Sequence, residues 1–238
     1  MKILALDSSA KPASVSIFED EKMLGSFYIN TEQTHSQTLI PMIDALLKNT
    51  CVKIRDIDIF CVSKGPGSFT GIRIGMSVIK GLAMAYNKPC IGISTLKALA
   101  YNIRYFNGII CPVMDARCHQ VYNALFEYKN GSIERLTEDR AIDIDILSQE
   151  LINSKKNINL VGDGAIICYN ELKNKIHSIS IAPENMRYQN SNSIAYLSYN
   201  YISSHPEQIT SAQKLFPEYL RLSQAERELK KKLYQKLS

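Results

Sequence analysis

The sequence lacks the features that would place it outside the ordinary class of globular proteins. Only four apolar residues, Ile3 to Leu6, precede Asp7, and this run is too short for a signal peptide or a membrane span. None of the six cysteines forms a Cys-x-x-Cys pair, which favours reduced core thiols over a disulfide framework or a zinc site. We therefore expect a cytoplasmic protein that makes no membrane contact.

Several catalytic motifs are absent as well. The glycine block Gly65 to Gly75 has no Gly-Lys pair, as a P-loop needs, and its third glycine comes one residue late for a dinucleotide fingerprint. No Gly-x-Ser-x-Gly elbow occurs, so a hydrolase nucleophile is not indicated. Leu39 stands where a helical metal pair with His35 would need a second histidine, so a capping or interface role for His35 is favoured. The other three histidines have no cysteine or carboxylate at a ligand spacing.

Positive charge is concentrated at the end of the chain. The net charge is +5, and the segment from Arg221 to Ser238 holds six basic and two acidic residues, so the remainder carries only about +1. A strongly basic nucleic-acid footprint on the body of the fold is therefore not expected. The Lys230–Lys232 run is either a solvated face or a contact with RNA phosphates.

Apolar periodicity predicts an α/β first half. A three-stranded antiparallel meander comes first, and helices then alternate with strands, which indicates a mixed sheet with helices on its faces. The expected elements are strands 2–7, 13–19 and 22–29, a helix after Thr34 with Leu39, Met42, Ile43, Leu46 and Leu47 facing inward, a strand at 57–63, a helix capped by Thr70, a strand at 89–94 and a helix from Thr95.

From Ile109 the pattern partly restarts as a shorter copy, and each copy opens with a strand that ends in aspartate, Asp7 and Asp115. The expected elements are a strand at 109–114, its hairpin partner at 119–128, a turn at 129–132, a helix at 142–151, a strand at 158–161 and a helix at 193–203. We predict an N-terminal domain at 1–107, a smaller second domain at 108–222 and a basic helix or tail at 223–238.

Two segments contain candidate binding residues. Asp7 with Ser8 and Ser9 resembles the phosphate loop of actin-like and sugar-kinase-like ATPases, although that loop usually has a glycine where a serine stands here. A weak nucleotide contact by these residues and a turn-capping role for Asp7 are both open. Gly71 and Gly75, four residues apart, leave one helix face bare, where another element can pack closely. A plain tight turn is the alternative for the preceding glycines.

Several segments, in this order along the chain, together resemble the bacterial TsaB (YeaZ) family. They are residues 3–9, 35–41, 65–75, 115–117 with Val121-Tyr122, 162–164 and 217–221, so the resemblance spans nearly the whole chain. It implies an α/β fold, a duplicated actin-like ATPase (ribonuclease H-like) architecture with mixed sheets flanked by helices and a reduced second domain.

The resemblance also implies a role in threonylcarbamoylation of the tRNA adenosine next to the anticodon. TsaB-like proteins are the non-catalytic partners of the sister protein TsaD, which binds a metal through a His-x-x-x-His helix, and the ATPase TsaE joins the assembly. With Leu39 in the second histidine position, no catalytic or metal-binding residue is expected here. ATP, ADP and metal are expected on the partner subunits, tRNA is bound through the complex, and the family permits a homodimer through the same face when TsaD is absent.

The implied partner surface lies on the first-domain helices. Its expected residues are His35, Leu39, Met42, Ile43, Gly67, Ser68, Phe69, Thr70, Gly71, Arg73, Gly75 and Met76. A Gly75→Leu substitution is expected to abolish pairing and to leave the monomer folded. The alternative function is a nucleotide-binding ATPase or phosphotransferase of the actin-like clan. A peptidase is a further rival, but no nucleophile–base pair supports it.

Overall fold

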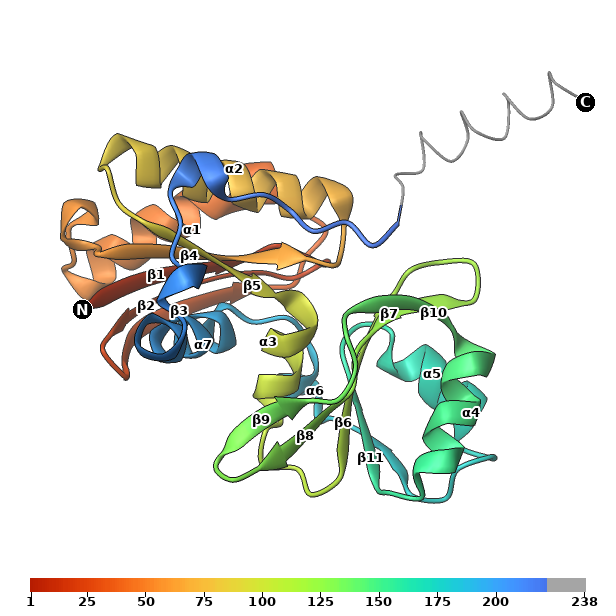
Figure 1. The fold of residues 1–238 in the computed structure, drawn as a ribbon. Coiled ribbons are helices and arrows are strands. Elements are labelled where there is room, and N and C mark those ends of the chain that lie inside the picture. The colour runs from red at the N-terminus through yellow and green to blue at the C-terminus, as the bar shows by residue number, and fades with distance from the viewer. Residues whose placement is uncertain (222–238) are drawn as a thin grey trace, which may run out of the picture.

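A five-stranded mixed sheet grows from the opening meander, which forms as predicted (Figure 1). The computed structural model describes residues 1–221, so the expected basic helix or tail at 223–238 lies outside the described residues. The strand order is β3-β2-β1-β4-β5, with the β1, β4 and β5 strands parallel. Their bounds are β1 Lys2–Asp7, β2 Ala13–Glu19, β3 Lys22–Ile29, β4 Ile59–Gly65 and β5 Cys90–Ser94.

Helices cover both faces of this first sheet (Figure 1). Helix α1 (His35–Thr50) and helix α2 (Phe69–Ala85) pack on one face through a single apolar cluster. Helix α3 (Thr95–Asn102) and helix α7 (Ser191–Ser204) cover the other face. The inward positions expected for α1 are buried, except that Leu47 is only partly buried.

The second sheet repeats the order of the first. Its path is β10-β7-β6-β11-β12, with β6, β11 and β12 parallel and the other two strands antiparallel, as in the first sheet. The additional strands β8 and β9 form a hairpin on β6. This duplication confirms the expected actin-like ATPase fold. The bounds are β6 Ile109–Asp115, β7 Gln120–Asn123, β8 Phe126–Lys129, β9 Ser132–Arg135, β10 Arg140–Asp143, β11 Ile158–Val161 and β12 Ile179–Ile181.

The hairpin partner expected at 119–128 is two strands instead of one. Pro112 in β6 has no N–H group to donate to a neighbouring strand, so the ladder cannot run without a break. The side chain of Asn123 donates to the carbonyl oxygens of Pro112 (2.9 Å) and Ala124 (3.1 Å), and β8 begins only at Phe126. The turn predicted at 129–132 is confirmed, with positive φ at Asn130 and Gly131.

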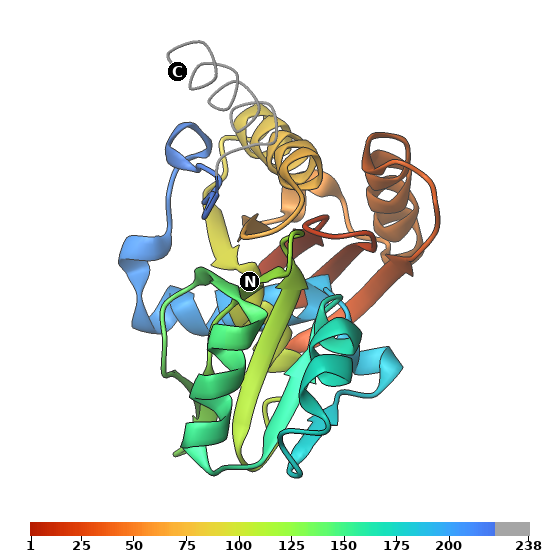
Figure 2. The same ribbon diagram turned by 90° about the vertical axis from the view of Figure 1, so that its right-hand side faces the viewer.

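Helices also cover both faces of the second sheet. Helices α4 (Ile144–Ser154) and α5 (Ala165–Leu172) cover the face that points away from the first sheet (Figure 2). Helix α3 packs on the opposite face, beside the short helix α6 (Glu184–Arg187). The helix predicted at 142–151 begins two residues later, because Asp143 closes β10 and then caps α4 by accepting from the N–H of Asp145. The sequence did not predict β9, β10, β12, α5 or α6.

Helix α7 corrects the predicted domain limits. It lies in the segment assigned to the second domain, yet it packs on β1, β2 and β4 of the first sheet. The chain after α7 also returns to the first sheet, where the N–H of Cys90 donates to the carbonyl of Thr210. We therefore define the first lobe as β1–β5 with α1, α2, α3 and α7, and the second lobe as β6–β12 with α4, α5 and α6.

Short 3-10 helices at Ile54–Asp56, Pro206–Gln208 and Ala212–Lys214 complete the described chain. Within residues 1–221, no helix has both the length and the hydropathy that crossing a bilayer requires.

Candidate functional site

The glycine block packs against the chain's own β1–β2 turn. Gly65 and Gly67 have φ angles of +121° and +156°, as the sequence predicts for a tight strand-to-helix junction. A Cβ atom at Gly67 would lie 2.3 Å from the carbonyl oxygen of Ser9, and the N–H of Ser68 donates to that same oxygen at 2.7 Å. The Ser68 hydroxyl accepts from the N–H of Gly71, so Ser68 caps α2. The prediction that Thr70 caps this helix is wrong, because α2 begins at Phe69 and Thr70 lies within its first turn.

The face of Gly71 and Gly75 receives the same turn. The Ser8 hydroxyl donates to the carbonyl of Gly71 at 2.9 Å. A Cβ atom at Gly71 would lie 2.1 Å from the Ser8 carbonyl oxygen, and one at Gly75 would lie 2.2 Å from the Ser8 hydroxyl oxygen. The prediction of a close approach is confirmed, but the approaching element belongs to this chain. The expectation that Gly75→Leu leaves the monomer folded is therefore wrong, since leucine would displace the β1–β2 turn.

Four other residues of the expected partner surface lie in the core of the first lobe. Leu39, Met42, Ile43 and Met76 are buried in the apolar cluster that joins α1 and α2 to the sheet. They have no surface to offer a partner, so their assignment is corrected. His35 is half-buried at the start of α1, where its Nε2 is hydrogen-bonded to the carbonyl of Ala10 at 2.8 Å.

Asp7 caps the turn that follows β1. The carboxylate is only 1% exposed, and its Oδ1 accepts from the N–H of Ser9 (2.9 Å) and from the hydroxyls of Ser9 (2.6 Å) and Ser63 (3.0 Å). Burial raises the pKa of Asp7, and the bonds from Ser9 and Ser63 oppose that rise. Ser8 and Ser9 are also fully buried, and Ser9 lies in the wall of the cleft between the lobes. Turn capping, the alternative that the sequence left open, describes Asp7.

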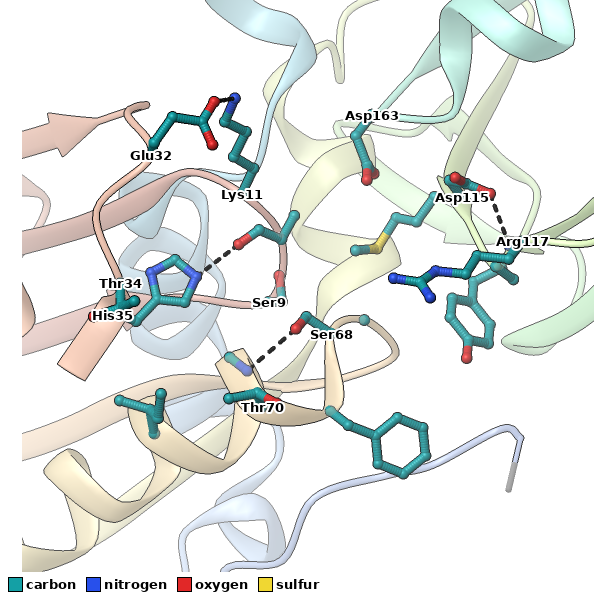
Figure 3. A pocket seen from close by; sticks show the side chains of 18 of the residues that line it. Ser9, Lys11, Glu32, Thr34, His35, Ser68, Thr70, Asp115, Arg117 and Asp163 are labelled. Atoms are coloured by element: carbon teal, nitrogen blue, oxygen red, sulfur yellow. Dashed lines mark hydrogen bonds and ion pairs between the residues drawn. The ribbon is translucent and has the colours of Figure 1, made fainter. Parts of the chain in front are cut away.

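A cleft of about 730 Å³ separates the two lobes (Figure 3). It lies at the carboxyl ends of β1, β4, β6 and β11, which is where open α/β sheets bind ligands. Both lobes contribute polar side chains to its lining. They include Ser9, Lys11, Glu32, His35, Ser68 and Thr70 from the first lobe, and Asp115, Arg117 and Asp163 from the second.

Asp163 is the cleft residue with the most perturbed acidity. Burial raises its pKa to about 6, the neighbouring Asp115 adds to the rise, and a hydrogen bond from the Gln189 amide (3.2 Å) opposes it. Asp163 follows β11 within the Gly162-Asp163-Gly164 segment. The N–H of Gly164 donates to the carbonyl of Val113, which ties this segment to β6. Asp163 thus lies beside the exposed Asp115 at this end of the cleft.

Among residues 1–221, the structure brings together a group of metal-ligand types that sequence spacing did not reveal. Ligand atoms of His119, Asp143 and Asp145 lie within 4.8 Å of one another on the surface of the second lobe. His119 is 24 residues from Asp143, so only the packing of the 115–119 loop against α4 places them together. The ammonium of Lys175 lies 3.9 Å from the Asp145 carboxylate and already supplies a positive charge.

The exposed apolar surface of the first lobe lies elsewhere on α1 and α2. Ile40 on α1 is 51% exposed. Ile74, Val78 and Leu82 on α2 are four residues apart, so they share one face, and each is only partly buried against the core. We call these four residues the α1/α2 strip. The neighbouring Gly81 is exposed, and nothing outside its own helix backbone lies within 4 Å of a Cβ atom built there.

Comparisons with known proteins agree with this architecture. The chain matches the model of the family described as TsaD, tRNA N6-adenosine threonylcarbamoyltransferase, over residues 27–229. The solved structure of YeaZ from Pseudomonas aeruginosa has a TM-score of 0.76 to this chain and is 22% identical, covering 92% of this chain and 99% of that one. At that identity, the likeness shows the fold.

Two curated relatives are named tRNA threonylcarbamoyladenosine biosynthesis protein TsaB. The one from Bacillus subtilis is 35% identical over 142 residues, which cover 60% of this chain and 62% of that protein, less than two thirds of its length. The one from Buchnera aphidicola subsp. Schizaphis graminum is 33% identical over 167 residues, which cover 68% of this chain and 78% of that protein. The chain therefore belongs to the TsaB (YeaZ) family, within the wider group that the TsaD model describes.

Proposed function

We propose that this chain is a non-catalytic subunit for threonylcarbamoylation of the tRNA adenosine next to the anticodon. It binds the catalytic subunit TsaD and activates it together with TsaE in the cytoplasm. The names of its relatives support a role in threonylcarbamoyladenosine synthesis. The partners and the absence of catalysis are our inference.

The α1/α2 strip is the observation that carries the partner role. Ile40 on α1 leaves half of its surface in water, and Ile74, Val78 and Leu82 on the adjacent helix α2 are only partly buried. Covering such a strip contributes about 25 cal/mol per Å² of buried apolar area before the costs of association. Gly81, beside the strip, lets a partner helix approach the α2 backbone closely. A second copy of this chain occupies the same strip when TsaD is absent.

Leu39 supports the absence of metal-dependent catalysis. It replaces the second histidine of a His-x-x-x-His helix, and its side chain has no atom that can bind a metal. It is also fully buried in the core of the first lobe. In this proposal the nucleotide and the metal bind the partner subunits, and this chain needs no cofactor of its own.

Reconstitution of threonylcarbamoyl transfer tests the proposal. Purified TsaD, TsaE, tRNA and threonylcarbamoyl adenylate are combined with and without this chain, and modified adenosine is measured by mass spectrometry. We expect modification only when this chain accompanies TsaD, and none from this chain alone. Modification by the isolated chain, or TsaD activity that does not depend on it, would overturn the proposal.

A charged residue in the α1/α2 strip is expected to weaken binding to a partner without destabilising the folded chain. Ile40→Asp places a carboxylate in the proposed interface and should weaken binding to TsaD, or to a second copy, by about 20-fold, because burying an unpaired charge is unfavourable. The change falls on a half-exposed residue, so the melting temperature should stay near that of the wild type. Binding is measured by analytical ultracentrifugation and by titration with TsaD.

A matched control lies on the second lobe. Ile146 on α4 is 62% exposed and is also an isoleucine within a helix, so Ile146→Asp makes the same chemical change away from the strip. We expect its binding to equal that of the wild type. Equal losses in both variants, or normal binding by Ile40→Asp, would move the interface away from α1 and α2.

The cleft favours a second candidate, a nucleotide-binding protein of the actin-like clan. Asp115 and Asp163 line the cleft opposite the amino-terminal end of α2, an arrangement that suits a cation and a phosphate. The N–H of Ser9 is already hydrogen-bonded to the Asp7 carboxylate, so the β1–β2 turn has one N–H donor fewer for a phosphate. A rise in melting temperature with millimolar ATP and Mg²⁺ would support this candidate, since a ligand of the folded state stabilises it.

A further inference from the structure

The chain after α7 runs along the first lobe and reaches the second. It passes β5, follows α2 and ends beside the second lobe (Figure 1). We call residues 216–221 the strap. Its first anchor is in the first lobe, where the N–H of Glu218 donates to the carbonyl of Lys64 (2.8 Å) and the Lys64 ammonium pairs with the Glu218 carboxylate (2.6 Å).

Tyr219 completes the anchor on the first lobe. Its ring stacks on Phe69 with 4.4 Å between centroids and 8° between planes, and its hydroxyl accepts from Nε of Arg73 at 2.8 Å. Phe69 and Arg73 both lie in the first two turns of α2. The two expected partner-surface residues are therefore already in contact with the strap.

The second anchor is in the second lobe. Leu220 packs against the apolar cluster that contains Met114, Ala116 and Tyr122. The guanidinium of Arg221 donates to the carbonyl of Ala116 and, at 3.5 Å, to that of Arg117. Two adjacent strap residues thus hold the loop at 115–119, which follows β6.

That loop has a backbone conformation that is costly without support. Arg117, Cys118 and His119 have φ angles of +61°, +55° and +60°, three consecutive residues in the left-handed region, and none of them is glycine. Each such residue raises the free energy of the loop, so the conformation persists only while surrounding contacts determine it. Arg221 supplies two of those contacts. The loop also directs Arg117 into the cleft, opposite Ser68 (Figure 3).

We propose that the strap is a latch that holds the 115–119 loop, and with it Arg117, in place from the α2 side of the first lobe. Release of Tyr219 from Phe69 and Arg73 then frees Arg221 and allows the loop to leave its left-handed conformation. A molecule that binds the amino-terminal end of α2 and displaces Tyr219 would in this way change the cleft. The contacts of Tyr219 with the first lobe and those of Arg221 with the second are thus coupled, so loss of one set weakens the other.

Hydrogen exchange measured by mass spectrometry on the full chain tests the latch. The N–H groups of Ala116, Arg117 and Gln120 are all hydrogen-bonded within the loop, so their exchange reports its opening. Arg221→Ala should accelerate this exchange at least about tenfold, because a hydrogen bond from a charged donor is lost. Tyr219→Ala, which removes the contacts with Phe69 and Arg73 of the first lobe, should accelerate it by several-fold.

Two further variants make the outcome decisive. Tyr219→Phe keeps the ring and loses the hydroxyl, so its effect should be smaller than that of alanine. Phe216→Ala changes an exposed strap residue (66% exposed) whose ring lies under the Lys80 ammonium, and it should leave the loop unchanged. Unchanged loop exchange in Tyr219→Ala would overturn the latch. A uniform rise that includes β1 and β6 would overturn it too, because it would show global destabilisation instead of coupling.

Discussion

Replacing Gly71 by alanine is expected to destabilise the protein by about 3 kcal/mol. The added Cβ atom would lie 2.1 Å from the carbonyl oxygen of Ser8, and a backbone oxygen cannot move aside as the end of a flexible side chain can. The β1–β2 turn must therefore shift, which disturbs the bonds from Ser8 to Gly71 and from Ser68 to Ser9. Urea unfolding followed by far-UV circular dichroism measures the change, with a lower midpoint at unchanged slope.

Gly81 provides a matched control on the same helix. Nothing lies within 4 Å of a Cβ atom built there, so Gly81→Ala adds the same methyl group without a clash. It should stabilise the isolated chain by about 0.5–1 kcal/mol, because alanine loses less backbone entropy than glycine in a helix. If Gly71→Ala proved as stable as the wild type, the turn would not lie against α2 in solution. If Gly81→Ala also weakened binding to TsaD, a close helix contact at the α1/α2 strip would be supported.

The glycines of α2 show how much of the site could be predicted from the sequence. Spacing of four between Gly71 and Gly75 predicts a close approach, because it places two residues without side chains on one helix face. It does not say which element approaches, since that depends on contacts between residues more than 60 positions apart, such as Ser8 with Gly71. The order of strands and helices in the first half could be predicted because apolar periodicity depends only on residues that are close in the sequence.

The errors arise where tertiary contacts override local pattern. Leu39, Met42 and Ile43 form an apolar helix face, and periodicity alone cannot distinguish a face that meets its own sheet from one that meets a partner. Ile40 is the exposed apolar residue of α1, and Ile74, Val78 and Leu82 of α2 are partly buried. Only the packing of the folded chain distinguishes these residues from the buried ones. Helix α7 was predicted from its sequence, but its return to the first lobe depends on long-range contacts with β1 and β2.

Replacing Asp163 by asparagine is expected to remove a pH-dependent loss of stability. The folded state raises the pKa of this carboxyl from its ordinary value of 3.8 to about 6, so the folded protein binds the proton more tightly than the unfolded chain does. Well below pH 3.8 both states are protonated and the group has no effect, whereas well above pH 6 both are ionised and the buried charge opposes folding. The wild type therefore loses about 3 kcal/mol from this group as the pH rises from 4 to 7.

Asparagine has nearly the same shape and keeps an oxygen that accepts from the Gln189 amide, so this side-chain contact is retained while the charge is removed. The free energy of unfolding of Asp163→Asn minus that of the wild type should rise by about 3 kcal/mol between pH 4 and pH 7, with the whole increase near pH 4 to 6. Urea unfolding of both proteins at a series of pH values measures that difference. A constant difference would show that Asp163 titrates alike in both states, and therefore that the cleft admits water to this carboxylate.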